Sequence, residues 1–68
     1  MVLKVEFDRE EDGRWIADIP ELPGVTVYGA TQEEALRRAV ALAFDVLARR
    51  IELGELPPEP LSLSIIAA

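Results

Sequence analysis

One long helical pattern takes up about a third of this chain of 68 residues, so every other element has to be short. Thr31 is a good N-cap, and Glu34 three residues later completes a capping box. Apolar residues then recur at helical spacing as far as Ile51, and Gly54 can serve as the C-cap. The pattern predicts a helix over about residues 32–53.

The predicted helix has a wide apolar side, which we expect to cover a sheet rather than to form a groove for a partner. Its small residues Ala39 and Ala43 would let another backbone come close, so they are candidate interface residues at the margin of that side. One apolar stripe comprises Leu36, Val40, Ala43, Leu47 and Ile51, and a flanking stripe comprises Ala35, Ala39, Leu42 and Val46.

Apolar and polar residues alternate in four short segments, as in strands that bury one face. Gly13 closes a charged turn between the first two segments, and residues 20–24, which contain two prolines, connect the next two. Residues 57–60 contain three prolines and form a stiff spacer before the last segment. The predicted strands cover about residues 2–8, 14–19, 25–28 and 61–66.

These elements predict a single α+β domain over residues 1–68, with the element order β-β-β-α-β. If the first three strands form an antiparallel meander, the helix crosses the sheet and returns the fourth strand parallel to the first. The result is a mixed sheet of order 3-2-1-4 with the helix on one face. Ile16 and Tyr28 lie on the other face, which has nothing to cover it and is a candidate contact surface.

A domain this short buries only about 60% of the surface that its unfolded chain exposes. The sequence contains no cysteine for a disulfide and no cluster of cysteine or histidine for a structural metal. Association with other chains is the remaining source of stability. We therefore expect a homo-oligomer, a dimer or larger.

Thirteen acidic residues against seven basic ones give a formal net charge of -6, which repels phosphate and argues against direct nucleic-acid binding. A small basic protein is a better partner. The longest fully apolar run, residues 39–44, is too short to span a membrane, and a strand pattern follows Met1 where a signal peptide would begin. We expect a cytoplasmic protein without membrane contact.

The sequence offers little for catalysis, because it has no histidine to act as a base and no cysteine to act as a nucleophile. A carboxylate-metal nuclease, with Asp8 and Asp18 as ligands, is a distant alternative. Both residues alternate onto the polar side of their strands, where acidic residues are expected in so acidic a chain. We predict a protein that is not an enzyme and that uses no cofactor.

A second pattern imitates a metal site, since Asp8, Glu10, Asp12 and Gly13 match the start of an EF-hand calcium loop. Ile19 stands at the twelfth position, where such a loop has a glutamate. The flanking segments read as strands, whereas an EF-hand requires helices. We interpret the segment as a hairpin turn without a metal.

Two stretches combine turn and cap motifs at a specific spacing. Residues 11–25 read Glu-Asp-Gly-Arg-Trp-Ile-Ala-Asp-Ile-Pro-Glu-Leu-Pro-Gly-Val, and residues 29–35 read Gly-Ala-Thr-Gln-Glu-Glu-Ala. Together they resemble the N-terminal domain of the HicB-like antitoxin family, the antitoxin half of HicA/HicB toxin–antitoxin pairs. The matching residues are Gly13, Trp15, Pro20, Leu22, Pro23, Gly24, Gly29, Thr31, Glu34 and Ala35.

The resemblance implies an antitoxin domain with a degenerate ribonuclease H-like fold, which masks a small basic toxin that cleaves messenger RNA. The matching residues would serve mainly as scaffold, because glycine and proline shape turns and Thr31 caps the helix. Ala30 departs from the family, which usually has an acidic residue there, and no C-terminal DNA-binding module follows, which leaves operator binding open. The alternative is a solitary module that assembles with itself and has no toxin partner.

Overall fold

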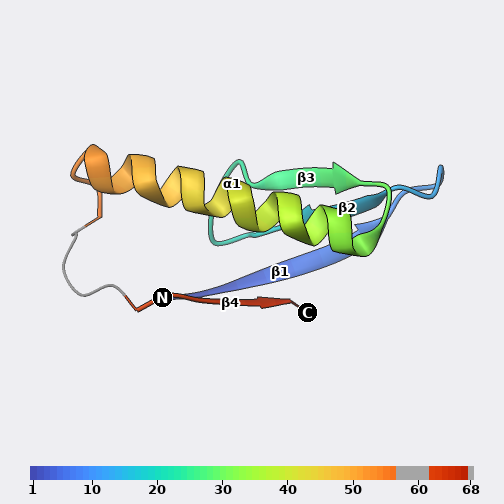
Figure 1. The fold of residues 1–68 in the computed structure, drawn as a ribbon, viewed down its shortest axis with the longest axis horizontal. Helices are drawn as coiled ribbons and strands as arrows, with labels where there is room; N and C mark the ends of the chain where they lie inside the picture. Colours follow the sequence, from blue (N-terminus) through green and yellow to red (C-terminus); the bar gives the residue numbers. More distant parts are fainter. Residues whose placement is uncertain (57–61, 68) are drawn as a thin grey trace.

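Four short strands form one sheet, and a single helix lies across it. The computed structural model describes residues 1–56 and 62–67. The sheet has the order β3-β2-β1-β4, in which β1, β2 and β3 run antiparallel and β4 runs parallel to β1. The predicted α+β class, element order and mixed sheet are therefore confirmed (Figure 1). The elements are β1 (Val2–Arg9), β2 (Trp15–Asp18), β3 (Thr26–Gly29), α1 (Gln32–Glu52) and β4 (Ser64–Ala67).

Alternation along the strands gives one face of the sheet an apolar surface. On β1 the buried residues are Leu3 and Val5, and the exposed residues between them point the other way. The strand register carries this pattern across the sheet, since Leu3 lies opposite Ile65 of β4 and Ala17 of β2 lies opposite Val27 of β3. All four strands therefore contribute apolar side chains to the face that the helix covers.

The helix begins at the predicted cap, Thr31, and one of its two capping hydrogen bonds differs from that of a standard capping box. The Thr31 hydroxyl accepts a hydrogen bond from the Glu34 N–H at 3.0 Å, as in a capping box. The Glu34 carboxylate accepts from the N–H of Ala30 at 3.2 Å, one residue before the cap. Gly54 follows the helix with φ 76°, the left-handed conformation that commonly ends helices.

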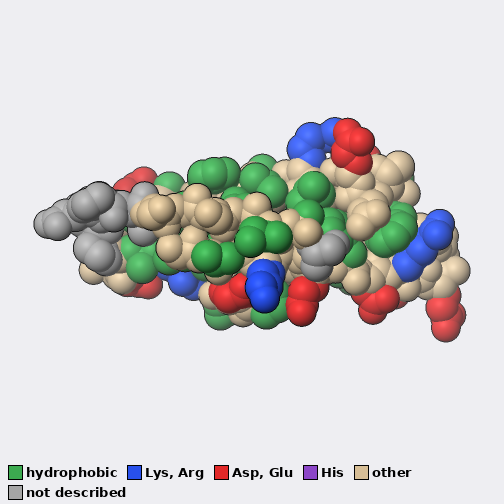
Figure 2. All heavy atoms as spheres, turned by 90° about the horizontal axis from the view of Figure 1, so that it is seen from below, with side chains coloured by type: hydrophobic (Ala, Val, Ile, Leu, Met, Phe, Trp, Pro, Cys, Tyr) green, Lys and Arg blue, Asp and Glu red, His purple; other side chains and the backbone are tan. Residues whose placement is uncertain are grey.

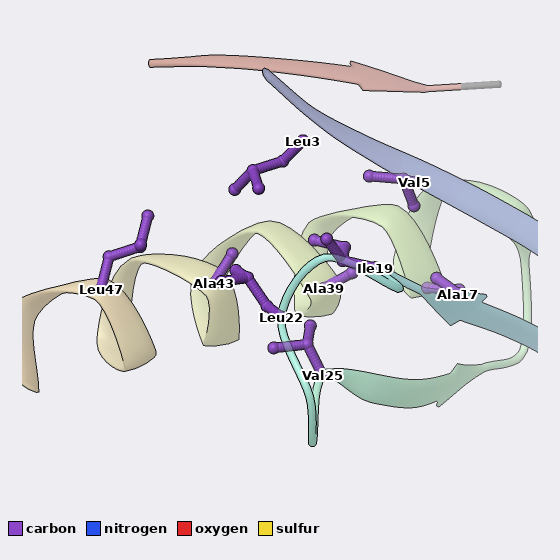
Figure 3. Packing of buried hydrophobic residues seen from close by; sticks show 10 residues of the cluster. Leu3, Val5, Ala17, Ile19, Leu22, Val25, Ala39, Ala43 and Leu47 are labelled. Atoms are coloured by element: carbon purple, nitrogen blue, oxygen red, sulfur yellow. The ribbon is translucent and has the colours of Figure 1, made fainter. Parts of the chain in front are cut away.

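The helix packs over β2 and β3 through its smallest side chains (Figures 1 and 3). Residues four apart on a helix lie above one another, and the row that begins at Ala35 is buried against the sheet. The close-up shows this row directed toward side chains from the strands and from the β2–β3 connection. The buried core consists of Leu3, Val5, Ala17, Ile19, Leu22, Val25, Ala35, Ala39, Ala43 and Leu47.

The alanine row corrects the prediction that Ala39 and Ala43 form a candidate interface. Both residues are fully buried in the core, because their small side chains let the helix come closest to the sheet at these positions. Leu36 and Val40 of the other stripe are only half-buried beside the alanine row. The helix therefore makes its closest contact with the sheet through the alanine row.

Gly29 allows this close contact between strand and helix. It is the last residue of β3 and lies opposite Trp15. A Cβ atom added at Gly29 would lie 2.5 Å from the backbone nitrogen of Ala35. What Gly29 contributes is therefore space for the first turn of the helix.

The observed bounds differ from the predicted ones by one to three residues at most ends: β2 is one residue shorter at each end, and β3 is shifted by one residue toward the C-terminus. The predicted proline spacer and the predicted start of the last strand at residue 61 lie outside the described residues. Among the described residues, no helix combines the length and the apolar character needed to cross a membrane.

Candidate functional site

The sheet face opposite α1 is covered by no other described element, and we name it the open face. Ile16 and Tyr28 lie opposite each other on this face, where the sequence placed them. Its side chains belong to the positions that alternate with the core, namely Val2, Lys4, Glu6, Asp8, Ile16, Asp18, Thr26, Tyr28, Ser64 and Ile66.

Three carboxylates occupy neighbouring positions on the open face. Glu6 lies directly opposite Asp18, and Asp8 lies opposite Ile16 on the neighbouring pair of positions. Side chains directly opposite in an antiparallel pair have Cβ atoms about 4.5–5.5 Å apart, and diagonal neighbours about 7–8 Å. We name the shallow surface hollow at this point, of about 680 Å³, the acidic hollow. It is lined by Glu6, Phe7, Asp8, Ile16, Asp18 and Thr26.

Among the described residues, no carboxylate of the acidic hollow forms an ion pair, and the nearest basic residue along β1 on this face is Lys4, two positions from Glu6. The ion pairs within the described residues are Arg14–Asp12, Arg37–Glu33 and Arg38–Glu34. The Asp18 carboxylate accepts one hydrogen bond, at 2.8 Å, from the neutral hydroxyl of Thr26. Like charges directly opposite each other destabilise a sheet, so Glu6 and Asp18 cost stability in the free protein. A cationic group bound in the acidic hollow would remove this cost.

Tyr28 borders the open face and is held by two arginines. The Arg14 guanidinium lies 4.8 Å from the centre of the Tyr28 ring, which is a cation–π contact. Arg38 on the helix donates a hydrogen bond to the Tyr28 carbonyl oxygen at 3.1 Å. Tyr28 as a whole is still 41% exposed. Tyr28 therefore contributes a partly covered aromatic surface beside the acidic hollow.

Asp12 holds Arg14 at the hairpin turn. The Asp12 carboxylate accepts hydrogen bonds from the Arg14 backbone N–H at 3.0 Å and from Nε at 2.9 Å. The bond from the backbone N–H, with a further contribution from the guanidinium, lowers the pKa of Asp12 below its ordinary value. Arg14 is thus engaged by a carboxylate that does not line the acidic hollow.

The segment that imitates a calcium loop folds as the predicted hairpin turn. Its Gly13 has φ 91° and donates its N–H to the Glu10 carbonyl oxygen at 2.9 Å. The flanking segments are strands β1 and β2. Within residues 1–56 and 62–67, no three acidic or histidine side chains are grouped so that they could hold a metal ion.

The residues that match the antitoxin motifs lie in turns, in the core and at the start of the helix. Gly24 has φ 93° in the β2–β3 connection, where Leu22 is buried. Trp15 is half-buried on the helix side, with its ring 6.4 Å from that of Phe7 in an edge-to-face arrangement. None of the matching residues lines the acidic hollow, so they support the fold rather than the open face.

Glu6 is the site residue that the sequence analysis missed, since only Asp8 and Asp18 were singled out. The alternation along β1 already indicated that Glu6 lies on the polar side of the strand. That it lies opposite Asp18 depends on the hairpin register, which the alternation does not give.

Comparisons with protein-family models, with curated proteins and with solved structures found no match to the chain. Its function is therefore inferred from the open face and from the sequence motifs.

Proposed function

We propose that this chain is a non-catalytic, cytoplasmic domain of the antitoxin type, which binds a small basic protein on its open face. The acidic hollow carries the proposal, because Glu6, Asp8 and Asp18 have no cationic partner among the described residues. A lysine or arginine of the partner would make charge-assisted hydrogen bonds there. Ile16 in the same hollow offers apolar contact to the stem of such a side chain.

The motif resemblance supports a HicA-type toxin as the partner. A toxin that cleaves messenger RNA has to attract phosphate, so its RNA-binding surface is basic. An acidic face that covers this surface would keep RNA away from it. The net charge of -6 would also accelerate encounter with a basic protein, more than it would add affinity.

The test measures association of this chain with the small basic protein encoded beside it, at low and at high salt. The first variant, Glu6→Gln with Asp8→Asn and Asp18→Asn, removes the charge of the acidic hollow. We expect its association rate constant to fall about tenfold or more and to lose most of its salt dependence. A matched control removes three charges from the helix and its C-terminal end through Asp45→Asn, Glu52→Gln and Glu55→Gln.

The control variant should associate within about twofold of the unmodified chain, because its substitutions lie away from the open face. Co-expression of the unmodified chain should also relieve the growth arrest that the toxin causes. Equal losses in both variants would contradict the open face as the binding surface. A neighbouring basic protein that does not bind the unmodified chain would contradict the function itself.

A further inference from the structure

The outer edge of β4 is surrounded by exposed apolar side chains. Six large hydrophobic side chains of the described residues are exposed, and three of them belong to this part of the molecule: Met1 (44%), Val2 (54%) and Ile66 (49%). Val2 lies opposite Ser64 on the neighbouring strand, and the Met1 carbonyl oxygen accepts a hydrogen bond from the Ser64 N–H. Figure 2 views the molecule from this edge and shows hydrophobic side chains along its length.

The helix side of the same edge is also apolar. Leu36 of α1 lines a small hollow together with Phe7 of β1 and Ala67 of β4, and the polar residues Gln32 and Glu33 complete its lining at the start of the helix. Apolar side chains therefore flank β4 on both faces of the sheet.

The backbone of β4 offers hydrogen-bonding groups on its outer side. The Ser64 N–H points inward to the Met1 carbonyl oxygen at 2.9 Å. Because successive residues of a strand direct these groups to opposite sides, those of Ile65 and Ala67 point outward. No described strand pairs with this side of β4. The opposite edge of the sheet is different, since Arg38 binds the carbonyl oxygen of Tyr28 on β3.

We propose that β4 pairs antiparallel with β4 of a second copy of this chain, so that two four-stranded sheets continue into one. The outward groups of Ile65 bond to those of Ala67 in the second copy, and the two-fold axis repeats these bonds. Ile66 then faces Ile66 of the second copy as a non-hydrogen-bonded pair. Both exposed isoleucines become covered.

Charge permits a second copy of the chain to bind at the β4 edge, whereas the carboxylates of the acidic hollow would repel a second copy there. Residues 62–67 contain no charged side chain, so two chains of net charge -6 can approach there. A stable interface needs about 800 Å² from each partner, about a sixth of the 4662 Å² that one chain exposes. A strand of four residues is too small for this, and the exposed side chains of Met1, Val2 and Ile66 supply additional apolar surface.

The arrangement goes beyond the proposed function, because it requires no toxin. A two-fold axis perpendicular to the sheet places both helices on one face of the continuous sheet and both acidic hollows on the other. The dimer thus presents two hollows on one surface. A basic partner with two cationic patches would bind both, and the second contact would be intramolecular.

Analytical ultracentrifugation of the full chain tests the interface. The unmodified chain should sediment with twice the 7.5 kDa of a single chain. Ile66→Lys places two ammonium groups together at the two-fold axis and should raise the dimer dissociation constant about a hundredfold or more. Tyr28→Lys changes an exposed residue on the opposite edge strand and should leave the dimer intact. Circular dichroism confirms that both variants are folded.

A cysteine variant tests the register, because the chain has no cysteine of its own. Non-hydrogen-bonded antiparallel pairs bring Cα atoms to about 4.5 Å, within the range that a disulfide spans. Ile66→Cys should therefore form a covalent dimer under mild oxidation, and Tyr28→Cys should remain monomeric under denaturing, non-reducing conditions. A folded unmodified chain that stays at 7.5 kDa up to millimolar concentration overturns the proposal, and so does an Ile66→Lys variant that dimerises normally.

Discussion

The two faces of the sheet are made by alternate residues of the same strands, yet their chemistry is opposite. On the helix side the buried residues are all apolar. On the open face, Glu6, Asp8 and Asp18 surround Ile16 without an ion pair among the described residues. The difference implies that one face supplies folding stability and that the other keeps negative charge accessible. Substitutions on the two faces should therefore separate stability from binding.

The largest expected difference in stability is between alanine substitutions at Ile19 and Ile16, which lie on opposite faces of the sheet. Ile19 is fully buried on the helix side, and Ile19→Ala should lower the free energy of unfolding by about 2–5 kcal/mol through lost burial and an unfilled cavity. Ile16 lies half-buried on the open face, and Ile16→Ala should lower it by less than about 1 kcal/mol. Urea unfolding followed by circular dichroism measures both values.

Protein concentration must be equal in these experiments, because dimerisation links apparent stability to concentration. Ile16→Ala should at the same time weaken binding of the basic partner. Similar losses of stability at both positions would mean that the open face is also covered in the folded protein. The separation of the two faces would then be wrong.

Gly29→Ala should have the next largest effect on stability. The added Cβ would lie 2.5 Å from the backbone nitrogen of Ala35, so strand and helix have to move apart. We expect a loss of about 1–3 kcal/mol in the free energy of unfolding, the usual cost of overpacking. Ala30→Ser, at the exposed neighbouring position, should change it by less than about 0.5 kcal/mol. Equal stability of the two variants would show that the contact between Gly29 and the backbone of Ala35 is not tight.

The strands and the helix start could be predicted from the sequence because each depends on local signals, and the strand order followed from the rules for connecting strands. Alternating residues such as Leu3 and Val5 identify a strand, and Thr31 with Glu34 identifies the cap. The orientation of the helix could not be predicted. The row that begins at Ala35 and the row that begins at Leu36 fit the same helical period, and the close approach of Gly29 to Ala35 goes with burial of the first row.

The acidic hollow was only partly predictable for a similar reason. Alternation placed Asp8 and Asp18 on the polar side of their strands. Which carboxylates lie opposite each other depends on the pairing register, and a shift would bring other residues together. The register follows from the turn that Gly13 closes, whose geometry the sequence indicates only in outline.

Neutralising a carboxylate of the acidic hollow should raise stability slightly. Glu6→Gln removes the like charge opposite Asp18 and leaves the Thr26–Asp18 hydrogen bond in place. We expect a gain of about 0.2–1 kcal/mol in the free energy of unfolding, which decreases as salt is added. Glu33→Gln is the control, since it breaks a helical ion pair with Arg37 and should lower stability by a few tenths of a kcal/mol.

A destabilised Glu6→Gln variant would contradict the repulsion inferred for the open face. If stability rises while the basic partner binds more slowly, the same carboxylate opposes folding and favours binding. That combination is expected for a residue on a surface that another protein covers.

Substitution of Asp12 should have the smallest effect on the free energy of unfolding, and this effect should depend on pH only in the acid range. Its pKa is lowered in the folded chain, mainly by the hydrogen bond from the Arg14 N–H. The carboxylate therefore contributes stability above its unfolded pKa, and this contribution is lost as the pH falls through the folded pKa. Asp12→Asn should make stability less dependent on pH between about 5 and 2, as measured by urea unfolding across that range.

The same variant also tests where the open face ends. Asp12 fixes Arg14, whose guanidinium lies over the Tyr28 ring. If Asp12→Asn changes the acid dependence of unfolding but leaves partner association unchanged, the Arg14–Tyr28 contact belongs to the hairpin alone. If association slows as well, the binding surface extends from the acidic hollow across Tyr28, because release of Arg14 has then altered a region that the partner contacts.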